Sequence, residues 1–278
     1  FIPAYSELFK FIDEANGRQA VYDFWNSLFQ PENSPLNHLI PKYGKLDGCW
    51  ENWYVVFTEE ACDNTMLQNN EKGWHLGCMH HCPSKGRFKK LGYMEPFEEY
   101  CKHCDSYEIV LGKYGLKTQM DYRGNEDAKC RSIIWDPEVF KGDPQEVLDK
   151  MYQCELEGCK FPEHPELCPL NPTGTKVLHT QSAEYKYLHR DFHNSMEYIA
   201  QHYGQDGLRA YLKKFALAFH KPLLANIKET GLAAVAEYFN WLYTEEEASD
   251  ALEMAVSQDS VDITIHYCPA VKHLKSRN

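Results

Sequence analysis

The feature that most constrains the fold is an internal repeat. The stretch from Trp50 to Leu91 resembles, without a gap, a stretch that lies 186 residues further along, so that Glu51 meets Glu237. Identical pairs are Thr58-Glu59-Glu60 with Thr244-Glu245-Glu246, His80 with His266, Cys82-Pro83 with Cys268-Pro269, and Lys89 with Lys275. With a slip of one residue, Gly17 meets Gly204 between predicted helices. A constant offset through separate motifs predicts a duplicated structural unit.

The two copies differ in length. The second copy stops at Asn278, which corresponds to Gly92, whereas the first runs on to Trp135. We therefore expect the second copy to be incomplete, either degenerate or truncated. The predicted organisation is a first unit over residues 1–140, a connector rich in proline and cysteine over 141–182, and a second, mainly helical unit over 183–278.

Hydrophobic periodicity predicts the order of the elements. Helices are expected over residues 6–16, 19–29, 97–113, 144–157, 183–201, 207–220 and 222–228, and strands over 74–82, 116–123 and 129–135. Residues 50–57 fit either a helix or a strand, and Thr58 is expected to cap a helix that starts after it. The predicted fold class is α+β, with helices packed on an antiparallel sheet in a duplicated unit.

Charge and composition exclude several classes of protein. The chain has 29 Lys+Arg against 41 Asp+Glu, and this net charge of −12 disfavours nucleic-acid partners, which need a basic surface. No apolar run approaches the roughly 18 residues of a membrane span. The 11 cysteines are an odd number, and no secretory signal opens the sequence. We expect a cytoplasmic, reducing setting, in which clustered cysteines bind metals or react.

The densest chemical cluster combines a His/Cys segment with a Cys-x-x-Cys segment. The first reads Cys78-Met79-His80-His81-Cys82-Pro83, and the second reads Cys101-Lys102-His103-Cys104-Asp105. Along a strand, Cys78, His80 and Cys82 share one face. If that face meets the second segment, the four thiolates of Cys78, Cys82, Cys101 and Cys104 form a zinc site or, with a softer metal, an iron–sulfur site.

Two other interpretations of these residues stay open. A cysteine beside a histidine and near a helix start can be a thiolate nucleophile, with Asp105 moving protons. In that case Cys82, Cys104, His80 and Asp105 are the catalytic residues. Alternatively, Cys78 and Cys82 are small residues of a buried core. In the connector, Cys154, Cys159 and Cys168 with His164 between them form a weaker candidate zinc site.

One segment carries a family resemblance. The runs Tyr100 to Asp105, Gly115-Leu116-Lys117-Thr118-Gln119 and Gly124-Asn125, followed by Cys130, resemble the L-2-amino-thiazoline-4-carboxylic acid hydrolase-like family. The resemblance implies an enzyme that opens a small cyclic amidine by hydrolysis of a non-peptide C–N bond. It also implies a site for the substrate carboxylate, for which Arg123 or Lys117 is suited. We expect Trp74 to contribute an aromatic wall to the pocket.

A second function from a different class competes with this one. The same cluster suits a module that binds zinc or an iron–sulfur group without turnover, or that senses a ligand. A subunit of a larger redox complex is a further alternative of this class. Stoichiometric metal without activity favours this module. Activity in metal-free protein excludes both metal-dependent functions.

Overall fold

The computed structural model describes residues 2–30, 34–158, 164, 168, 170, 171, 173–181 and 188–276. The chain divides into two compact units. One, the sheet unit, spans Phe9–Ala183, and the other, the C-terminal unit, joins Glu184–Asn278 to the first residues, Phe1–Leu8. Helices pack on antiparallel strands, so the predicted α+β class is confirmed. Within the described residues, no helix has both the length and the apolar character needed to cross a bilayer.

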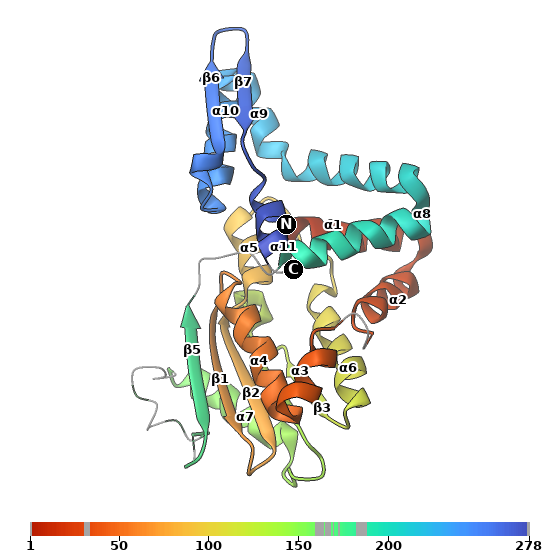
Figure 1. The fold of residues 1–278 in the computed structure, drawn as a ribbon, viewed down its shortest axis with the longest axis vertical. Coiled ribbons are helices and arrows are strands. Elements are labelled where there is room, and N and C mark those ends of the chain that lie inside the picture. Colours follow the sequence, from red (N-terminus) through yellow and green to blue (C-terminus); the bar gives the residue numbers. More distant parts are fainter. Residues whose placement is uncertain are drawn as a thin grey trace. The chain divides into compact units, whose positions relative to one another are not determined.

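A five-stranded antiparallel sheet forms the centre of the sheet unit (Figure 1). In spatial order its strands are β3 (Lys117–Asp121), β4 (Cys130–Trp135), β2 (Trp74–His81), β1 (Asp63–Asn69) and β5 (Lys176–Gln181). The predicted strand over 74–82 and the hairpin of 116–123 with 129–135 are confirmed as β2, β3 and β4. β5 lies in the expected connector and pairs with β1.

Each face of the sheet has its own apolar core. Helix α4 (Lys45–Thr58) lies on one face, which we call the α4 face, and helix α7 (Pro144–Leu156) lies on the other, the α7 face (Figure 1). Because side chains alternate along a strand, Met66 packs into the α4 core while its neighbour Leu67 packs into the α7 core. Like β5, α7 comes from the expected connector, so this segment completes the sheet unit.

The other helices of the sheet unit surround this sheet. They are α1 (Ile2–Asn16), whose first residues belong to the C-terminal unit, α2 (Arg18–Leu28), α3 (Leu36–Tyr43), α5 (Pro83–Leu91), α6 (Tyr107–Lys113) and the short 3-10 helices η2 (Tyr100–Ser106) and η3 (Asn125–Asp127). Phe9 is fully buried and contacts the rings of Trp25, Phe97 and Tyr100. These contacts connect α1, α2 and η2. They are strong because large aromatic side chains bury much apolar area.

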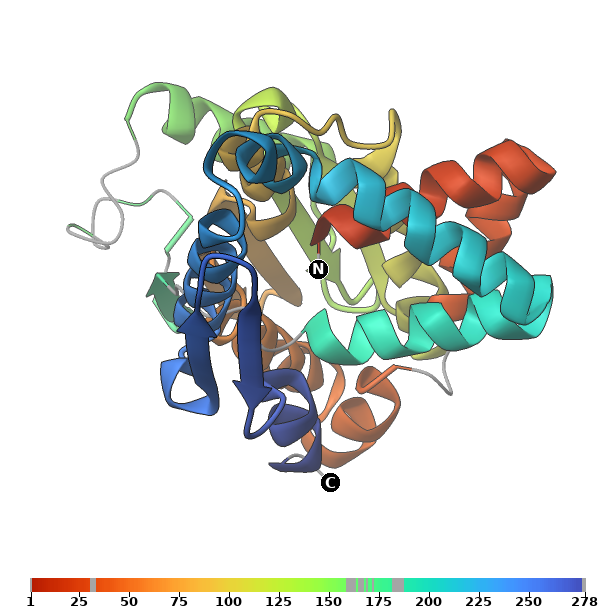
Figure 2. The ribbon, with the colours of Figure 1, turned by 90° about the horizontal axis from the view of Figure 1, so that it is seen from above.

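The C-terminal unit contains helices and one hairpin. Its elements are α8 (Leu188–Phe219), α9 (Lys221–Thr230), α10 (Ala233–Glu245), η5 (Ser249–Ala251), β6 (Leu252–Val256), β7 (Val261–Ile265) and α11 (Pro269–Ser276). Helix α8 folds back midway (Figure 2), where Gly204 has φ 68° and ψ −179°. Tyr211 of α8 is buried and donates a hydrogen bond to the carbonyl of Ala4, 2.7 Å away.

The order of elements in the C-terminal unit matches the start of the sheet unit. In both, two helices meet at a glycine with positive φ, Gly17 (φ 82°, ψ 170°) or Gly204. Two further helices follow, then an antiparallel hairpin, then a helix that begins with proline, Pro83 or Pro269. Positive φ is unfavourable for residues other than glycine, which explains why both sharp turns have this residue.

The structure decides one open alternative and corrects one prediction. Residues 50–57 are helical within α4, because Trp50, Trp53 and Phe57 line one side of a helix and bury against the sheet. Thr58 ends this helix rather than capping a new one: its hydroxyl donates back to the carbonyls of Tyr54 and Val55. A threonine hydroxyl can accept from the amides of a following helical turn or donate to the carbonyls of a preceding one. The sequence at Thr58 is therefore compatible with the start or the end of a helix.

Candidate metal centre

Three potential metal ligands meet on three adjacent strands of the sheet unit. They are Asp63 at the start of β1, His80 near the end of β2 and His179 in β5. One ligand atom from each lies within 4.8 Å of the others, the spacing of a site for a single metal ion. The side chains of Asp63 and His179 are 30% and 18% exposed, so solvent reaches the group.

Strand register explains why these residues meet. Thr65 of β1 is paired with Cys78 of β2 on one side and with His179 of β5 on the other. The β1–β2 register shifts between Asp63 and Asn64, so that Asp63 pairs with His81 and Asn64 with Met79. His80 is therefore the extra residue of a β-bulge. Bulges change the direction of a side chain, and here the imidazole lies beside Thr65.

Thr65 holds both imidazoles. Its buried hydroxyl oxygen lies 2.9 Å from Nε2 of His80 and 3.0 Å from Nδ1 of His179. On the far side of His179, Nε2 lies 3.5 Å from Oδ1 of Asp63, and Gln181 donates to Oδ2 of Asp63. A hydroxyl has only one proton to donate, so the tautomers of the two histidines are coupled through Thr65.

The electrostatics favour a neutral His80. Burial lowers the pKa of its imidazole, and the carboxylate of Asp63 only partly opposes this effect. A neutral imidazole has a lone pair available for a metal, whereas an imidazolium has none. Oδ1 of Asp63 is buried and accepts no hydrogen bond from the described residues. A metal ion fits this donor set because it would bind that oxygen and the histidine nitrogens together.

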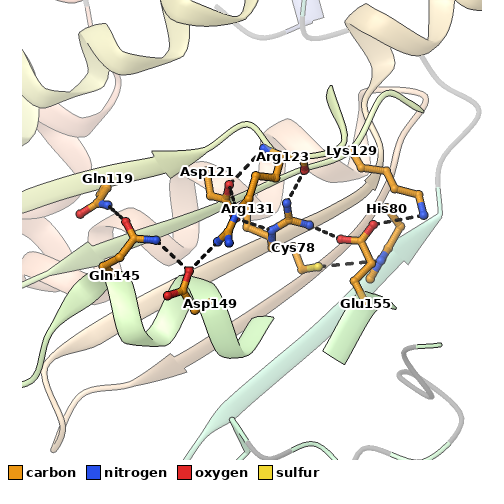
Figure 3. Close-up of polar contacts among 10 residues, drawn as sticks. All are labelled: Cys78, His80, Gln119, Asp121, Arg123, Lys129, Arg131, Gln145, Asp149 and Glu155. Carbon is orange, nitrogen blue, oxygen red and sulfur yellow. Dashed lines mark hydrogen bonds and ion pairs between the residues drawn. The ribbon is translucent and has the colours of Figure 1, made fainter. Parts of the chain in front are cut away.

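A network of ion pairs lies next to the centre on the α7 face (Figure 3). The guanidinium of Arg131 is fully buried and donates to Asp121, 2.9 Å away, and to Glu155 of α7. Lys129 lies 3.1 Å from the same Glu155 carboxylate. Cys78 is also on this face, with Sγ 3.9 Å from Nδ1 of His80. The network fixes the end of α7 against β4, beside the two histidines.

Cys82 does not share a face with Cys78 and His80, contrary to the sequence prediction. β2 ends at His81, and Cys82 is the N-cap of α5, where its backbone N–H donates to the carbonyl of Ala128. The reason is Pro83, which starts a helix readily and cannot donate to a neighbouring strand. Cys78 belongs to the apolar core on the α7 face.

The other predicted cysteines are not in the group formed by Asp63, His80 and His179. Cys101 and Cys104 are on η2, and Asp105 next to them accepts a hydrogen bond from Tyr122, 2.7 Å away. Burial raises the pKa of the Cys82 thiol to about 11 and that of Cys104 to about 12. Both thiols are therefore protonated at neutral pH, which makes them weak nucleophiles.

The predicted substrate-binding residues do not surround the metal centre. Arg123 is held by Asp121 and Asp149, each 2.8 Å away. Trp74 is buried at the opposite end of β2 from His80, six residues away or about 20 Å at the usual rise of a strand. Lys117 lies at that same end, because Lys117 and Trp74 both pair with Trp135.

The candidate zinc site of the connector is only partly described. Cys159 lies outside the described residues. Cys154, Cys168 and His164 are described, and they do not belong to the group of ligand atoms within 4.8 Å.

Asp63 and His179 are two site residues that were not predicted from the sequence. The run Lys176-Val177-Leu178-His179-Thr180-Gln181 has the β-branched residues and alternation of a strand, and this signal would have found His179. Asp63 has no comparable local signal, because only the pairing of β1 with β2 and β5 gives it its neighbours. Comparisons of the chain with family models, with curated proteins and with solved structures give no match.

Proposed function

We propose that this chain is a zinc-dependent hydrolase that cleaves a non-peptide C–N bond in a small molecule, with the metal bound by Asp63, His80 and His179. The observation that carries the proposal is the convergence of these three ligand atoms within 4.8 Å. Catalytic zinc sites typically have three protein ligands from histidine and carboxylate side chains and leave a fourth position for water.

The state of the thiols supports a metal-activated water over a cysteine nucleophile. The thiols of Cys82 and Cys104 have raised pKa values, so little thiolate is present near neutral pH. Zinc lowers the pKa of a bound water to about 7 and so supplies hydroxide under the same conditions. The type of bond cleaved, that of a cyclic amidine, comes from the family resemblance of residues 100–130.

The proposed reaction is a simple hydrolysis. Asp63, His80 and His179 would hold the zinc, which would supply a water acidic enough to act as hydroxide toward the amidine carbon. The hydrolysis forms a C–O bond and breaks the C–N bond, and both protons of the water pass to the leaving nitrogen. Thr65 holds the two imidazoles in their tautomers during this process, since its hydroxyl contacts both rings.

Zinc binding and hydrolysis test the proposal together. We expect the centre formed by Asp63, His80 and His179 to bind one zinc that is lost in His179→Gln and in His80→Ala. The zinc should be kept in His38→Ala, a change of an exposed histidine on α3. The zinc-loaded chain should hydrolyse 2-aminothiazoline-4-carboxylate, and chelation should abolish this activity. Zinc bound at these residues without turnover supports the non-catalytic module instead. Activity that survives complete zinc removal contradicts the proposal.

We also infer that the C-terminal unit is a partial copy of the sheet unit. The shared order of elements, the two helix-breaking glycines and the offset of the sequence motifs support this. An experimental structure tests it: α10, β6, β7 and α11 should superpose in the same hand on α4, β1, β2 and α5. A hairpin packed on the opposite side of α10 contradicts a common origin.

We place the protein in a reducing, cytoplasmic compartment. Thiols that are free in the described residues include those of Cys49, Cys62, Cys82, Cys101, Cys104, Cys130 and Cys268. Chains with this many free thiols are typical of compartments where thiols stay reduced.

A further inference from the structure

Four cysteines come together at one end of the sheet unit from three separate elements. Cys82 caps α5, Cys101 and Cys104 lie on η2, and Cys130 is the first residue of β4. The backbone N–H of Cys82 donates to the carbonyl of Ala128, 2.6 Å away, which brings the start of α5 beside the start of β4. These contacts place Cys82 and Cys130 on adjacent segments.

Side-chain hydrogen bonds hold η2 against the same region. The hydroxyl of Tyr122, which follows β3, donates to Oδ1 of Asp105, 2.7 Å away. Helix η2 also contacts β3, and η3 contacts α5. In a 3-10 helix, residues three apart lie on the same side, so Cys101 and Cys104 project from η2 together. Both cysteines therefore lie close to the turn that leads into Cys130.

The four thiols are separate from the His/Asp centre. Cys130 precedes Arg131, whose side chain is on the α7 face, so Cys130 projects from the α4 face. Cys78 is paired with Arg131 and lies with His80 on the α7 face. The cysteine group that the structure brings together therefore contains Cys130 and not Cys78, which the sequence predicted as its fourth member.

The surroundings of the thiols suit a bound soft cation. All four cysteines are half-buried, so an ion bound between them would be partly screened from solvent. Cys82 is the N-cap residue of α5, where the backbone N–H groups of the first helical turn lie. Such donors stabilise a thiolate, and a metal would supply the positive charge that the group otherwise lacks.

We propose that Cys82, Cys101, Cys104 and Cys130 form a second metal centre, a thiolate site for a soft metal, on the opposite face of the sheet from the His/Asp centre. Two metal groups are bound by four thiolates of this kind, a single zinc ion and an iron–sulfur cluster. A tetrahedral zinc holds sulfurs at about 2.3 Å from the metal, and no three of these sulfurs lie within 4.8 Å in the described residues. An iron–sulfur cluster holds its thiolates further apart than a single zinc does, so this spacing does not exclude a cluster.

Metal loading of the intact chain tests this proposal. Chain purified without oxygen is incubated with ferrous iron and sulfide, or with zinc alone, in the His179→Gln background, which removes the first centre. We expect either visible absorbance with iron and acid-labile sulfide in the protein, or one tightly bound zinc. Cys104→Ser and Cys130→Ser should lose at least tenfold of the binding, whereas Cys78→Ala and Cys268→Ser should keep it.

Two controls keep the result interpretable. Circular dichroism and thermal unfolding show whether each variant folds. If Cys104→Ser or Cys130→Ser does not fold, X-ray absorption of the metal-loaded chain without cysteine changes decides, because four sulfur neighbours at about 2.3 Å are expected. The proposal is overturned if neither iron nor zinc binds through sulfur. It is also overturned if Cys78→Ala abolishes the binding and Cys130→Ser does not. Loss of zinc from the His/Asp centre alone leaves this result unaffected.

Discussion

At the scale of single residues, Thr65 sets the geometry of the His/Asp centre. Its hydroxyl contacts both imidazoles, so Thr65→Val should leave the rings without their common partner while keeping the shape of the side chain. We expect zinc affinity to fall by about 10- to 100-fold, the usual effect of removing a group that orients a ligand. Isothermal titration with zinc measures this change.

Thr180→Val is the matched control. Thr180 is also in the sheet, on β5, and its buried hydroxyl has no hydrogen-bond partner in the described residues. Its zinc affinity should remain that of the unmodified chain. Equal losses in the two variants would show that Thr65 has no special role in the centre.

Arg131 should contribute more to stability than its neighbour Arg123. Arg131 is fully buried and pairs with Asp121 and Glu155, so Arg131→Met leaves these two largely buried carboxylates with only one partly exposed cation each, Arg123 and Lys129. The expected cost is about 3–5 kcal/mol of unfolding free energy. Arg123 is 40% exposed, and Arg123→Met should cost about 1 kcal/mol or less. Urea denaturation measures both, and similar losses would contradict the assigned role of Arg131.

His75 should make the fold sensitive to acid. It is fully buried, and burial lowers its pKa to about 3. Between pH 6.5 and pH 3 the unfolded chain binds a proton at this histidine and the folded chain does not, so stability falls as the pH falls through this window. From pH 7 to pH 5 the unmodified chain should lose about 2 kcal/mol more than His75→Gln.

Urea unfolding at the two pH values measures this difference. The exposed His38 gives the control, because His38→Gln should lose as much stability on acidification as the unmodified chain does. An acid response in His75→Gln identical to that of the unmodified chain would refute the explanation.

The residues of the site were only partly predictable. His80 and the cysteines were recognised because they are close together in the sequence. Asp63 and His179 were not, since 116 positions separate them (179 − 63) and only the pairing of β1 with β5 makes them neighbours. The expectation that Cys82 faces the same way as His80 failed because Pro83 ends the strand and starts a helix.

At the scale of elements, one glycine controls how two helices pack. Gly48 of α4 faces α3, and a Cβ at this position would lie 2.6 Å from the Cα of Ile40. Backbone atoms move at a high cost, so Gly48→Ala should destabilise the fold by about 1–3 kcal/mol although alanine favours helices. Gly112 in α6 has open space, and Gly112→Ala should be neutral or stabilise by up to about 1 kcal/mol.

Thermal unfolding of the two variants measures the difference between the helices. If the Gly48→Ala and Gly112→Ala proteins are equally stable, the backbones of α3 and α4 are further apart than a 2.6 Å contact requires.

Elements with a strong local signal were predicted well. The hairpin of β3 and β4 has alternating side chains and a turn at Gly124, and α7 has an Asp143 cap that accepts a hydrogen bond from Gln145. The segment 50–57 was ambiguous because tryptophan, tyrosine and valine also favour strands. As a helix, this segment buries its apolar side chains against the sheet, which favours the helical conformation. This packing cannot be read from the sequence.

At the scale of the whole molecule, the sequence indicated the fold class but not how the sheet is completed. The expected connector supplies α7 to one face and β5 to one edge. The helix was predicted over residues 144–157, but no strand was predicted over 176–181, because the preceding prolines and cysteines suggested a loop. As a result, His179, a ligand of the proposed zinc centre, lay in a segment that received little weight.

The central claim is that Asp63, His80 and His179 bind one zinc ion. Anomalous diffraction at the zinc absorption edge, on crystals of the zinc-loaded chain, tests this most directly. We predict a peak between these three side chains, with nitrogen and oxygen ligands at about 2.0–2.2 Å. Zinc-loaded crystals with anomalous peaks at other residues and none between these three would contradict it.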